Sequence, residues 1–297
     1  MSISQLKLVE INTPEISIQK NQYLAGMPQL AYAGLSENWL LKECGHRHWM
    51  GLADLSGKQQ PDFQDENGHK SYAAFTAVRI SSAKLNSVKE NQQLTITSQV
   101  SRAGQARHFS MHHVKSENEN ITNIQMLSTF VFRREVGNNQ SVTRASFANL
   151  RQTEPSTEAS TLMQQCKKIR ADDWLEHMGL SRASKATIKE IEFLPCPNHD
   201  FNGANFLYFA SFQAYVDRAA WAWASSQPGN KSIENLPSIV NRDLFFYGNI
   251  NVGDTLRIRL CAVKIDGIYS TDWCEVYAGN GSKIADVFTQ KILSVQP

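Results

Sequence analysis

Residues 200–224 read DFNGANFLYFASFQAYVDRAAWAWA, a polar loop that contains a glycine and runs into a long apolar segment. In this segment apolar side chains recur at the spacing of an amphipathic helix, at Phe212, Tyr215, Val216, Ala219, Ala220 and Trp223. The preceding run ATIKEIEFL (186–194) alternates apolar and polar residues, as a half-buried strand does. The sequence therefore predicts a strand, a loop and a helix in this order.

Four β-rich runs with glycine-containing turns follow the helix, and they predict an antiparallel meander. The runs are IVNRDLFFYGNI (239–250), DTLRIRLCAV (254–263), STDWCEVYA (270–278) and KIADVFTQKIL (283–293). The first half repeats this order, because AYAGLSENWLLKECGHRHW (31–49) predicts a loop and a helix that stops at Gly45. Four β-rich runs again come next, at YAAFTAVRI (72–80), NQQLTITSQV (91–100), RHFSMHHV (107–114) and IQMLSTFVFRRE (124–135).

Corresponding landmarks of the two halves lie at nearly constant separations. Gly34 and Gly203 precede the two helices and are 169 positions apart, while Leu94 and Leu256 begin equivalent strands and are 162 positions apart. Such offsets indicate an internal repeat of ~150 residues, and two unrelated α+β domains are the alternative.

We divide the chain into a first unit (1–136), a linker with a helical segment (137–185) and a second unit (186–297). Part of the Ser/Thr/Gln/Asn-rich linker is expected to lie on the surface. We expect an α+β fold in which each of two long helices is wrapped by a strongly curved antiparallel sheet, the double hot-dog architecture.

Composition limits the partners and the compartment. The chain has 297 residues, 41% hydrophobic and 20% charged, with a net charge of +2, which gives no electrostatic case for nucleic acid or an anionic membrane. Its five cysteines are far apart and form no CxxC pair, so neither a disulfide framework nor a structural zinc site is expected. The N-terminus lacks the apolar core of a signal peptide, and no run approaches ~20 apolar residues. A cytoplasmic protein without a membrane segment is expected.

Several stretches resemble known acyl-thioester enzymes. The loop 200–203 with the following LYFASFQAYVDRA resembles the loop-plus-helix signature of hot-dog enzymes such as the hydroxybenzoyl-CoA thioesterases. DFNGANFLYFASFQAYVDRAAWAWA and DLFFYGNINVGDTLRI, together with SYAAFTAVRI and SVKENQQLTITSQVSRAGQ, resemble the leinamycin-type bifunctional acyltransferase/decarboxylases of polyketide biosynthesis. The resemblance covers most of both halves in the same order. GLSENWLLKECGHRHW (34–49) departs from it and looks more like a related group with the same layout.

The resemblance implies a substrate, partners and a catalytic residue. The family takes methylmalonyl-CoA, releases CO₂ and delivers propionyl to the phosphopantetheine thiol of an acyl carrier protein, with no separate cofactor. Its key tyrosine lies on the first strand after the helix, and the motif places it at Tyr72. A phenol ordinarily titrates near ~10, so a nucleophilic role requires activation, whereas donating a hydrogen bond does not.

The loops that precede the two helices are predicted to line an acyl-thioester pocket. Decarboxylation of a malonyl-type thioester creates an enolate, which unpaired N–H groups at a helix start can stabilise. Glycines at 34 and 203 would let the substrate approach the backbone, or would simply permit a tight turn. The predicted substrate-binding residues are Gly34, Leu35, Ser36, Asn38, Asp200, Asn202, Gly203 and Asn205. Ser36 also suits a helix N-cap, and Asp200 is the position where hot-dog thioesterases often carry a carboxylate.

Histidines are the remaining candidates for chemistry. His46 and His48 are predicted near the end of the first helix, and His108 and His112 on one face of a strand. No nearby carboxylate or cysteine completes a ligand set, so no metal site is predicted.

Three functions follow from these observations. The first is an enzyme that decarboxylates a (methyl)malonyl-CoA and transfers the acyl group to an acyl carrier protein. The second is a hot-dog thioesterase or dehydratase acting on CoA or carrier-protein thioesters, and the third is a non-catalytic module that docks an acyl carrier protein. The two units are expected to pack against each other, and a homodimer of the whole chain remains open.

Overall fold

The computed structural model describes residues 15–104, 106–145, 147, 154–226 and 236–293. The N-terminal residues 1–14 and most of 146–153 in the predicted linker lie outside this part of the chain. The first unit contains one long helix and five long strands, namely β1 (Ile16–Leu24), α1 (Glu37–Leu55), β5 (Lys70–Ser81), β6 (Gln93–Arg102), β7 (Arg107–Ser116) and β8 (Glu119–Arg133). Short elements accompany them, namely β2 (Leu30–Ala31), β3 (Gly34–Leu35), β4 (Phe63–Gln64) and a 3₁₀ turn (Leu85–Ser87). The start of the predicted linker adds a second 3₁₀ turn (Asn139–Ser141) and β9 (Val142–Arg144), which pairs with β8.

The second unit repeats the strand, helix and four-strand order. Its elements are β12 (Lys189–Phe193), the short α3 (Pro197–Asp200), α4 (Phe209–Ser225), β13 (Ser238–Phe246), β14 (Leu256–Asp266), β15 (Tyr269–Ala278) and β16 (Lys283–Ile292). The strands of the first unit are ordered β1-β6-β7-β8-β5, and those of the second β12-β14-β15-β16-β13. The two orders correspond strand for strand, so the internal repeat is present in the topology.

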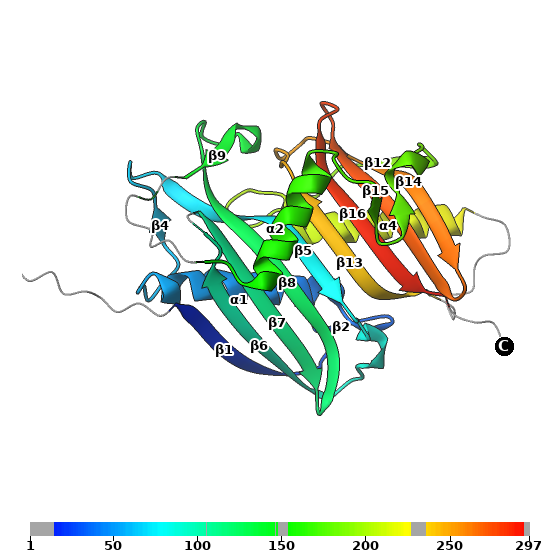
Figure 1. Cartoon of the computed structure of the whole chain (residues 1–297), viewed down its shortest axis with the longest axis horizontal. Coiled ribbons are helices and arrows are strands. Elements are labelled where there is room, and N and C mark those ends of the chain that lie inside the picture. Colours follow the sequence, from blue (N-terminus) through cyan, green and yellow to red (C-terminus); the bar gives the residue numbers. More distant parts are fainter. Residues whose placement is uncertain (1–14, 105, 146, 148–153, 227–235, 294–297) are drawn as a thin grey trace, which may run out of the picture.

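The two units share one continuous antiparallel sheet. The innermost strands β5 and β13 pair through Ala77–Ile80 and Arg242–Phe245, which joins the two five-stranded halves edge to edge. α1 and α4 lie on the same side of this sheet, behind it in Figure 1, and they contact each other. One hydrophobic core contains buried residues of both helices and both half-sheets. The prediction that the two units pack together within one chain is therefore confirmed.

The helix α1 differs from its expected length. Ser36 caps its start by accepting a hydrogen bond from the N–H of Trp39, and Glu37 lies in the first turn, where the helix dipole favours an acid. The helix does not stop at Gly45 but continues to Leu55. A Cβ at position 45 would lie 2.7 Å from the ring of Phe209, so this glycine allows the two helices to approach closely.

The linker covers the outer face of the sheet. It contains α2 (Thr157–Arg170), the hairpin strands β10 (Glu176–His177) and β11 (Leu180–Ser181), and a 3₁₀ turn (Arg182–Ser184). α2 contacts β5, β8 and β13 and crosses in front of them in Figure 1. Buried side chains of this segment, among them Leu162, Ile169 and Trp174, form a second core with Phe245 and Trp273. This segment therefore packs as part of the fold.

The first strand was missed by the sequence reasoning. β1 pairs with β6 over Ile16–Leu24 and lies at one end of the sheet. No helix of the described residues is long and apolar enough to cross a membrane.

Candidate active site

A cavity opens where the two central strands separate. Pairing between β5 and β13 ends at Ala77 and Phe245, next to a bulge in β5 between Phe75 and Ala77. Beyond this point β5 continues along β8, and β13 continues along β16. A cavity of about 850 Å³ lies there, lined by side chains from both units. Its volume lies within the ~300–1,000 Å³ range of small-molecule sites.

Tyr72 lies on the wall of this cavity. It sits near the start of β5, opposite Val131 of β8, and is partly exposed. Its ring meets Phe206 of the second unit edge to face, with 5.6 Å between ring centroids. The site therefore combines a strand of one unit with the loop before the helix of the other. The sequence placed Tyr72 and Gly203 in a pocket, and both line this cavity.

Arg133 is a second prominent side chain beside Tyr72, and the sequence reasoning missed it. Its guanidinium carbon lies 3.8 Å from the ring centroid of Phe206 and 5.7 Å from that of Tyr72. It donates hydrogen bonds to the carbonyl of Ala204 and, at 2.8 Å, to Oδ1 of Asn139. Burial lowers the pKa of Arg133, and the neighbouring Tyr72 hydroxyl opposes this shift. Arg133 thus places a positive charge at the Tyr72 phenol.

Asn139 ties the loops of the second unit to the first. Its Nδ2 donates to the carbonyls of Asn205 at 2.5 Å and Ile250 at 2.7 Å, and its N–H donates to Oδ1 of Asn251 at 2.7 Å. Asn139 is buried and lines the cavity. Together with Arg133 it fixes the second-unit loops against the end of β8, the strand that pairs with the one carrying Tyr72.

The loop before α4 forms another wall. Oδ1 of Asn202 accepts hydrogen bonds from the N–H groups of Ala204 (3.0 Å) and Phe206 (3.1 Å), which shapes the loop, and Asn202 and Gly203 line the cavity. A Cβ at Gly203 would meet no atom within 4 Å. Asn205 does not line the cavity. It adopts a φ of +60° and contributes its carbonyl to Asn139, so its predicted contact with substrate is replaced by a structural one.

The start of α4 faces the cavity without a side-chain cap. Tyr208 occupies the N-cap position, and no hydrogen bond from its side chain caps the helix. Tyr208 and Phe209 both line the cavity. Since the first N–H groups of a helix have no partner within it and lie at its positive end, this wall is suited to negative charge on a substrate oxygen.

Asp200 does not face the cavity, which corrects its predicted role in binding substrate. Its buried carboxylate accepts hydrogen bonds from the N–H of Cys196 at 2.7 Å and the hydroxyl of Tyr215 at 2.6 Å. Its Oδ1 lies 3.9 Å from Arg218. The residue therefore joins the α3 turn to α4.

The loop before α1 also lies away from the cavity, so the four residues predicted there need correction. Gly34 has a φ of +121°, and a Cβ would lie 2.3 Å from the carbonyl oxygen of Leu85, so it serves a tight turn. Leu35 is buried in the core, Ser36 caps α1, and Asn38 donates to the carbonyl of Ala210. None of the four lines the cavity formed by the described residues.

A buried ion cluster occupies the corresponding region at the other helix start. Arg242 of β13 is fully buried and donates to Oε1 of Glu37 at 2.7 Å and to Oδ1 of Asp217 at 2.5 Å. Burial raises the pKa of Glu37 to about 7, although Arg242 opposes this, and Arg242 also holds the pKa of Asp217 below its usual value. Near this cluster the segment that follows β5 stays bonded to β13, because the N–H of Ala83 donates to the carbonyl of Val240 at 2.8 Å. The repeat is therefore asymmetric at its two helix starts.

Two histidines belong to a buried polar chain beside the cavity. His48 lines the cavity, and its ring nitrogens lie 2.7 Å from Ser110 Oγ and 2.8 Å from Ser128 Oγ. His112 continues the chain from Ser110 to Ser98, at 2.8 Å each. Burial lowers the pKa of His48 well below its usual value and that of His112 to about 3, so both are neutral near pH 7. The described residues contain no group of three or more His, Cys, Asp or Glu side chains placed to hold a metal ion.

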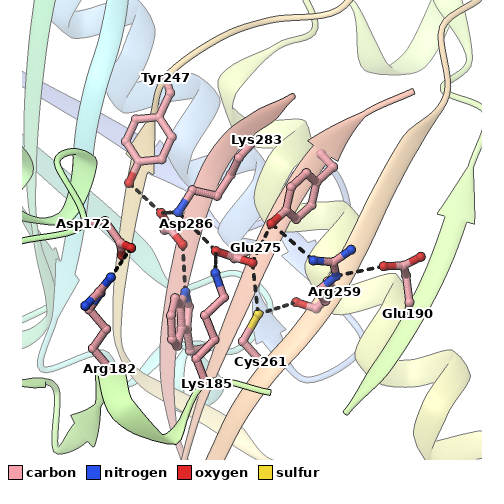
Figure 2. Close-up of polar contacts among 12 residues, drawn as sticks. Asp172, Arg182, Lys185, Glu190, Tyr247, Arg259, Cys261, Glu275, Lys283 and Asp286 are labelled. Carbon is pink, nitrogen blue, oxygen red and sulfur yellow. Dashed lines mark hydrogen bonds and ion pairs between the residues drawn. The ribbon is translucent and has the colours of Figure 1, made fainter. Parts of the chain in front are cut away.

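The opposite wall carries Tyr247 and Lys283, which are fixed by carboxylates behind them. The Tyr247 hydroxyl donates to Asp286 at 2.7 Å, and Lys283 Nζ lies 2.9 Å from Asp286 and 3.1 Å from Glu275 (Figure 2). Asp286 and Glu275 do not line the cavity. Among the described residues, its lining contains no Asp or Glu side chain at all.

Comparisons with known proteins agree with this fold. No protein-family model and no curated protein matches the sequence. Among solved structures, the 12:0-ACP thioesterase from Umbellularia californica is similar with a TM-score of 0.59 and 10% identity, over 93% of this chain and 94% of that chain. An acyl-ACP thioesterase from Bacteroides thetaiotaomicron is similar with a TM-score of 0.54 and 8% identity, over 93% and 98%. The chain has a double hot-dog fold of the α+β class, as the sequence predicted.

Proposed function

We propose that this chain is an enzyme that acts on acyl thioesters of coenzyme A or an acyl carrier protein. The observation that carries the proposal is the composite cavity, in which Tyr72 of one unit lines the same space as the loop and uncapped helix start of the other, with Arg133 beside the Tyr72 ring. The fold is shared with acyl-ACP thioesterases, which supports the substrate class.

We further propose that the reaction is decarboxylation and acyl transfer, as the resemblance to the leinamycin-type enzymes implies. The bond between the α-carbon and the carboxylate breaks, CO₂ leaves, and the electron pair forms an enolate whose charge lies on the thioester oxygen. The Tyr72 hydroxyl and the first N–H groups of α4 would donate to this oxygen. The α-carbon then takes a proton from water, which gives the propionyl thioester. The carrier thiolate attacks the carbonyl, and the CoA thiolate leaves.

Arg133 has a defined part in this proposal. Its guanidinium lies 5.7 Å from the Tyr72 ring centroid, so Arg133 would stabilise negative charge that develops beside Tyr72 during the reaction. If Tyr72 instead attacks the thioester, an acyl-tyrosine ester forms and the CoA thiolate leaves before the carrier thiol accepts the acyl group. Both routes use the same pair of side chains.

Thioester hydrolysis is the second candidate function, because the solved structures of similar fold include thioesterases. Hydrolysis commonly uses a carboxylate to activate water. The carboxylate expected for this role, Asp200, is bonded to Cys196 and Tyr215 and lies outside the cavity. This arrangement favours transfer over hydrolysis by Asp200. A docking module without catalysis would show no turnover.

One experiment separates the three functions. The protein is incubated with methylmalonyl-, malonyl- and propionyl-CoA, with and without holo carrier protein, and CO₂, free thiol and carrier mass are followed. A decarboxylated acyl group on the carrier supports the proposal, and free acid supports hydrolysis. Tyr72→Phe should abolish most carrier acylation, and Tyr32→Phe is the control, since Tyr32 is exposed and does not line the cavity. Absence of turnover with every thioester would refute an enzymatic role.

A further inference from the structure

The rim of the cavity carries basic side chains without carboxylate partners. Lys70, Arg144 and Arg170 line the cavity and are exposed. Among the residues that the structure describes, no Asp or Glu oxygen lies within ion-pairing distance of these three. Lys283, the fourth basic residue of the lining, differs because Glu275 and Asp286 neutralise it (Figure 2). The rim therefore has an excess of positive charge.

Two of these cations share a sheet face with Tyr72. Tyr72 lies opposite Val131, and Val131 lies opposite Arg144, so the three residues form one row across β5, β8 and β9. Directly opposite residues point to the same face of a sheet, as do residues two apart on one strand. Lys70 precedes Tyr72 by two residues, and its Nζ lies 5.9 Å from the Tyr72 ring centroid. Arg144 and Lys70 thus lie beside the proposed reacting group.

Arg170 brings a third cation from a different element. It is the last residue of α2, and its guanidinium lies 5.8 Å from the ring centroid of Tyr247 on the opposite wall. Cations placed around one opening repel each other unless an anion joins them. A cleft whose rim has one sign of charge also concentrates ligands of the opposite sign. This distribution of positive charge favours an anionic ligand that spans the opening of the cavity.

We propose that Lys70, Arg144 and Arg170 form a phosphate subsite for the pantetheine arm of the substrate. This inference rests on the proposed function, because it places the thioester at Tyr72 and the phosphate at the rim. Both coenzyme A and a holo carrier protein have a phosphate at the end of the pantetheine arm opposite the thiol. Arg and Lys are the side chains that recognise phosphate, Arg in bidentate geometry and Lys as a point charge. The subsite recognises the phosphopantetheine arm of the thioester, and the interior of the cavity determines which acyl group is accepted.

Binding is measured by titration calorimetry with coenzyme A, dephospho-CoA, 4′-phosphopantetheine and pantetheine, at two salt concentrations. The variants are Lys70→Gln, Arg144→Gln, Arg170→Gln and the triple variant. Lys167→Gln and Lys168→Gln are matched controls, since both lysines are exposed in the last turn of α2 and do not line the cavity.

The wild type should bind phosphopantetheine at least ~10-fold more tightly than pantetheine, with weaker binding at high salt. Each variant should lose roughly 2- to 5-fold in affinity for phosphopantetheine, and the triple variant at least ~10-fold, because exposed ion pairs are individually weak. Pantetheine affinity should change little in all of them. The two lysine controls should bind as the wild type does.

Equal affinity for phosphopantetheine and pantetheine would overturn the proposal, as would a triple variant with unchanged affinity for phosphopantetheine. A loss confined to coenzyme A, with dephospho-CoA and phosphopantetheine unaffected, would also overturn it, because the anion bound would be the 3′-phosphate. The steady-state kinetics of the wild type and the variants are then compared with acyl-CoA and with acyl carrier protein as substrates. Because the calorimetry needs no turnover, a protein without enzymatic activity can still show phosphate-dependent binding, so the two proposals fail independently.

Discussion

Removal of the Arg242 guanidinium should strongly destabilise the protein. Arg242→Met leaves the buried Glu37 and the partly exposed Asp217 without the cation that they contact at 2.7 and 2.5 Å. Breaking a buried ion pair by removing one partner typically costs about 3–5 kcal/mol, because an uncompensated charge stays buried. The hydrogen bond from Nε to Thr289 is lost as well. We expect a loss of this size in the free energy of unfolding.

The pH dependence of the same cluster has a definite sign. Burial raises the pKa of Glu37 from 4.5 to about 7, so between these values the folded chain holds a proton that the unfolded chain releases. This contribution to stability is complete below pH 4.5 and is lost as the pH rises through about 7. The slope approaches about 1.4 kcal/mol per pH unit for one group. Glu37→Gln should remove this part of the pH dependence.

Urea unfolding between pH 4.5 and 8 measures both effects. The triple variant Glu37→Gln, Asp217→Asn, Arg242→Met should recover most of the stability lost in Arg242→Met, because no charge remains buried. Arg218→Met is the control on the exposed side of α4 and should stay within ~1 kcal/mol of the wild type. An Arg242→Met protein as stable as this control would refute the reasoning, as would a Glu37→Gln protein with the pH profile of the wild type.

Three further predictions concern the cavity and its surroundings. Tyr72→Phe should slow carrier acylation by roughly 10²–10³, the usual loss for one oxyanion donor, while the exposed Tyr32→Phe control stays active; a fast Tyr72→Phe enzyme would exclude Tyr72 from the chemistry. Gly34→Ala should lower the thermal midpoint of unfolding, because position 34 has a positive φ and a Cβ there would meet Leu85. Gly203→Ala should have the midpoint of the wild type in calorimetry, and equal midpoints for the two variants would contradict this reasoning. Burial lowers the pKa of His112 from 6.5 to about 3, so between these values the unfolded chain binds a proton that the folded chain does not. The free energy of unfolding should therefore fall as the pH drops below 6.5. This part of the pH dependence should be absent in His112→Gln.

The sequence predicted the repeated order of elements because the apolar periodicity of the helices and strands reflects burial directly. Gly45 misled the prediction, since its role depends on Phe209, which is 164 positions away in the sequence. The strand Ile16–Leu24 escaped notice because only one of its residues, Ser17, is fully buried. An edge strand with so little burial carries a weak apolar pattern.

The candidate site was harder to predict than the fold. Tyr72 was singled out by resemblance to a family, whereas Arg133 could not be found from sequence because its role depends on Phe206 and Ala204 of the other unit. Asp200 was assigned to substrate because local sequence does not show which way a carboxylate points. Its partner Tyr215 lies two turns into α4.

Joining the two units in one chain has an evolutionary consequence. In a dimer of identical subunits, symmetry forces each substitution to appear at both equivalent positions. A chain that carries both units is free of this constraint, so Arg242 fills one helix start while Tyr72 and Arg133 lie near the other. Mutation of one copy then no longer alters its counterpart. The two halves of the gene can therefore diverge under separate selection.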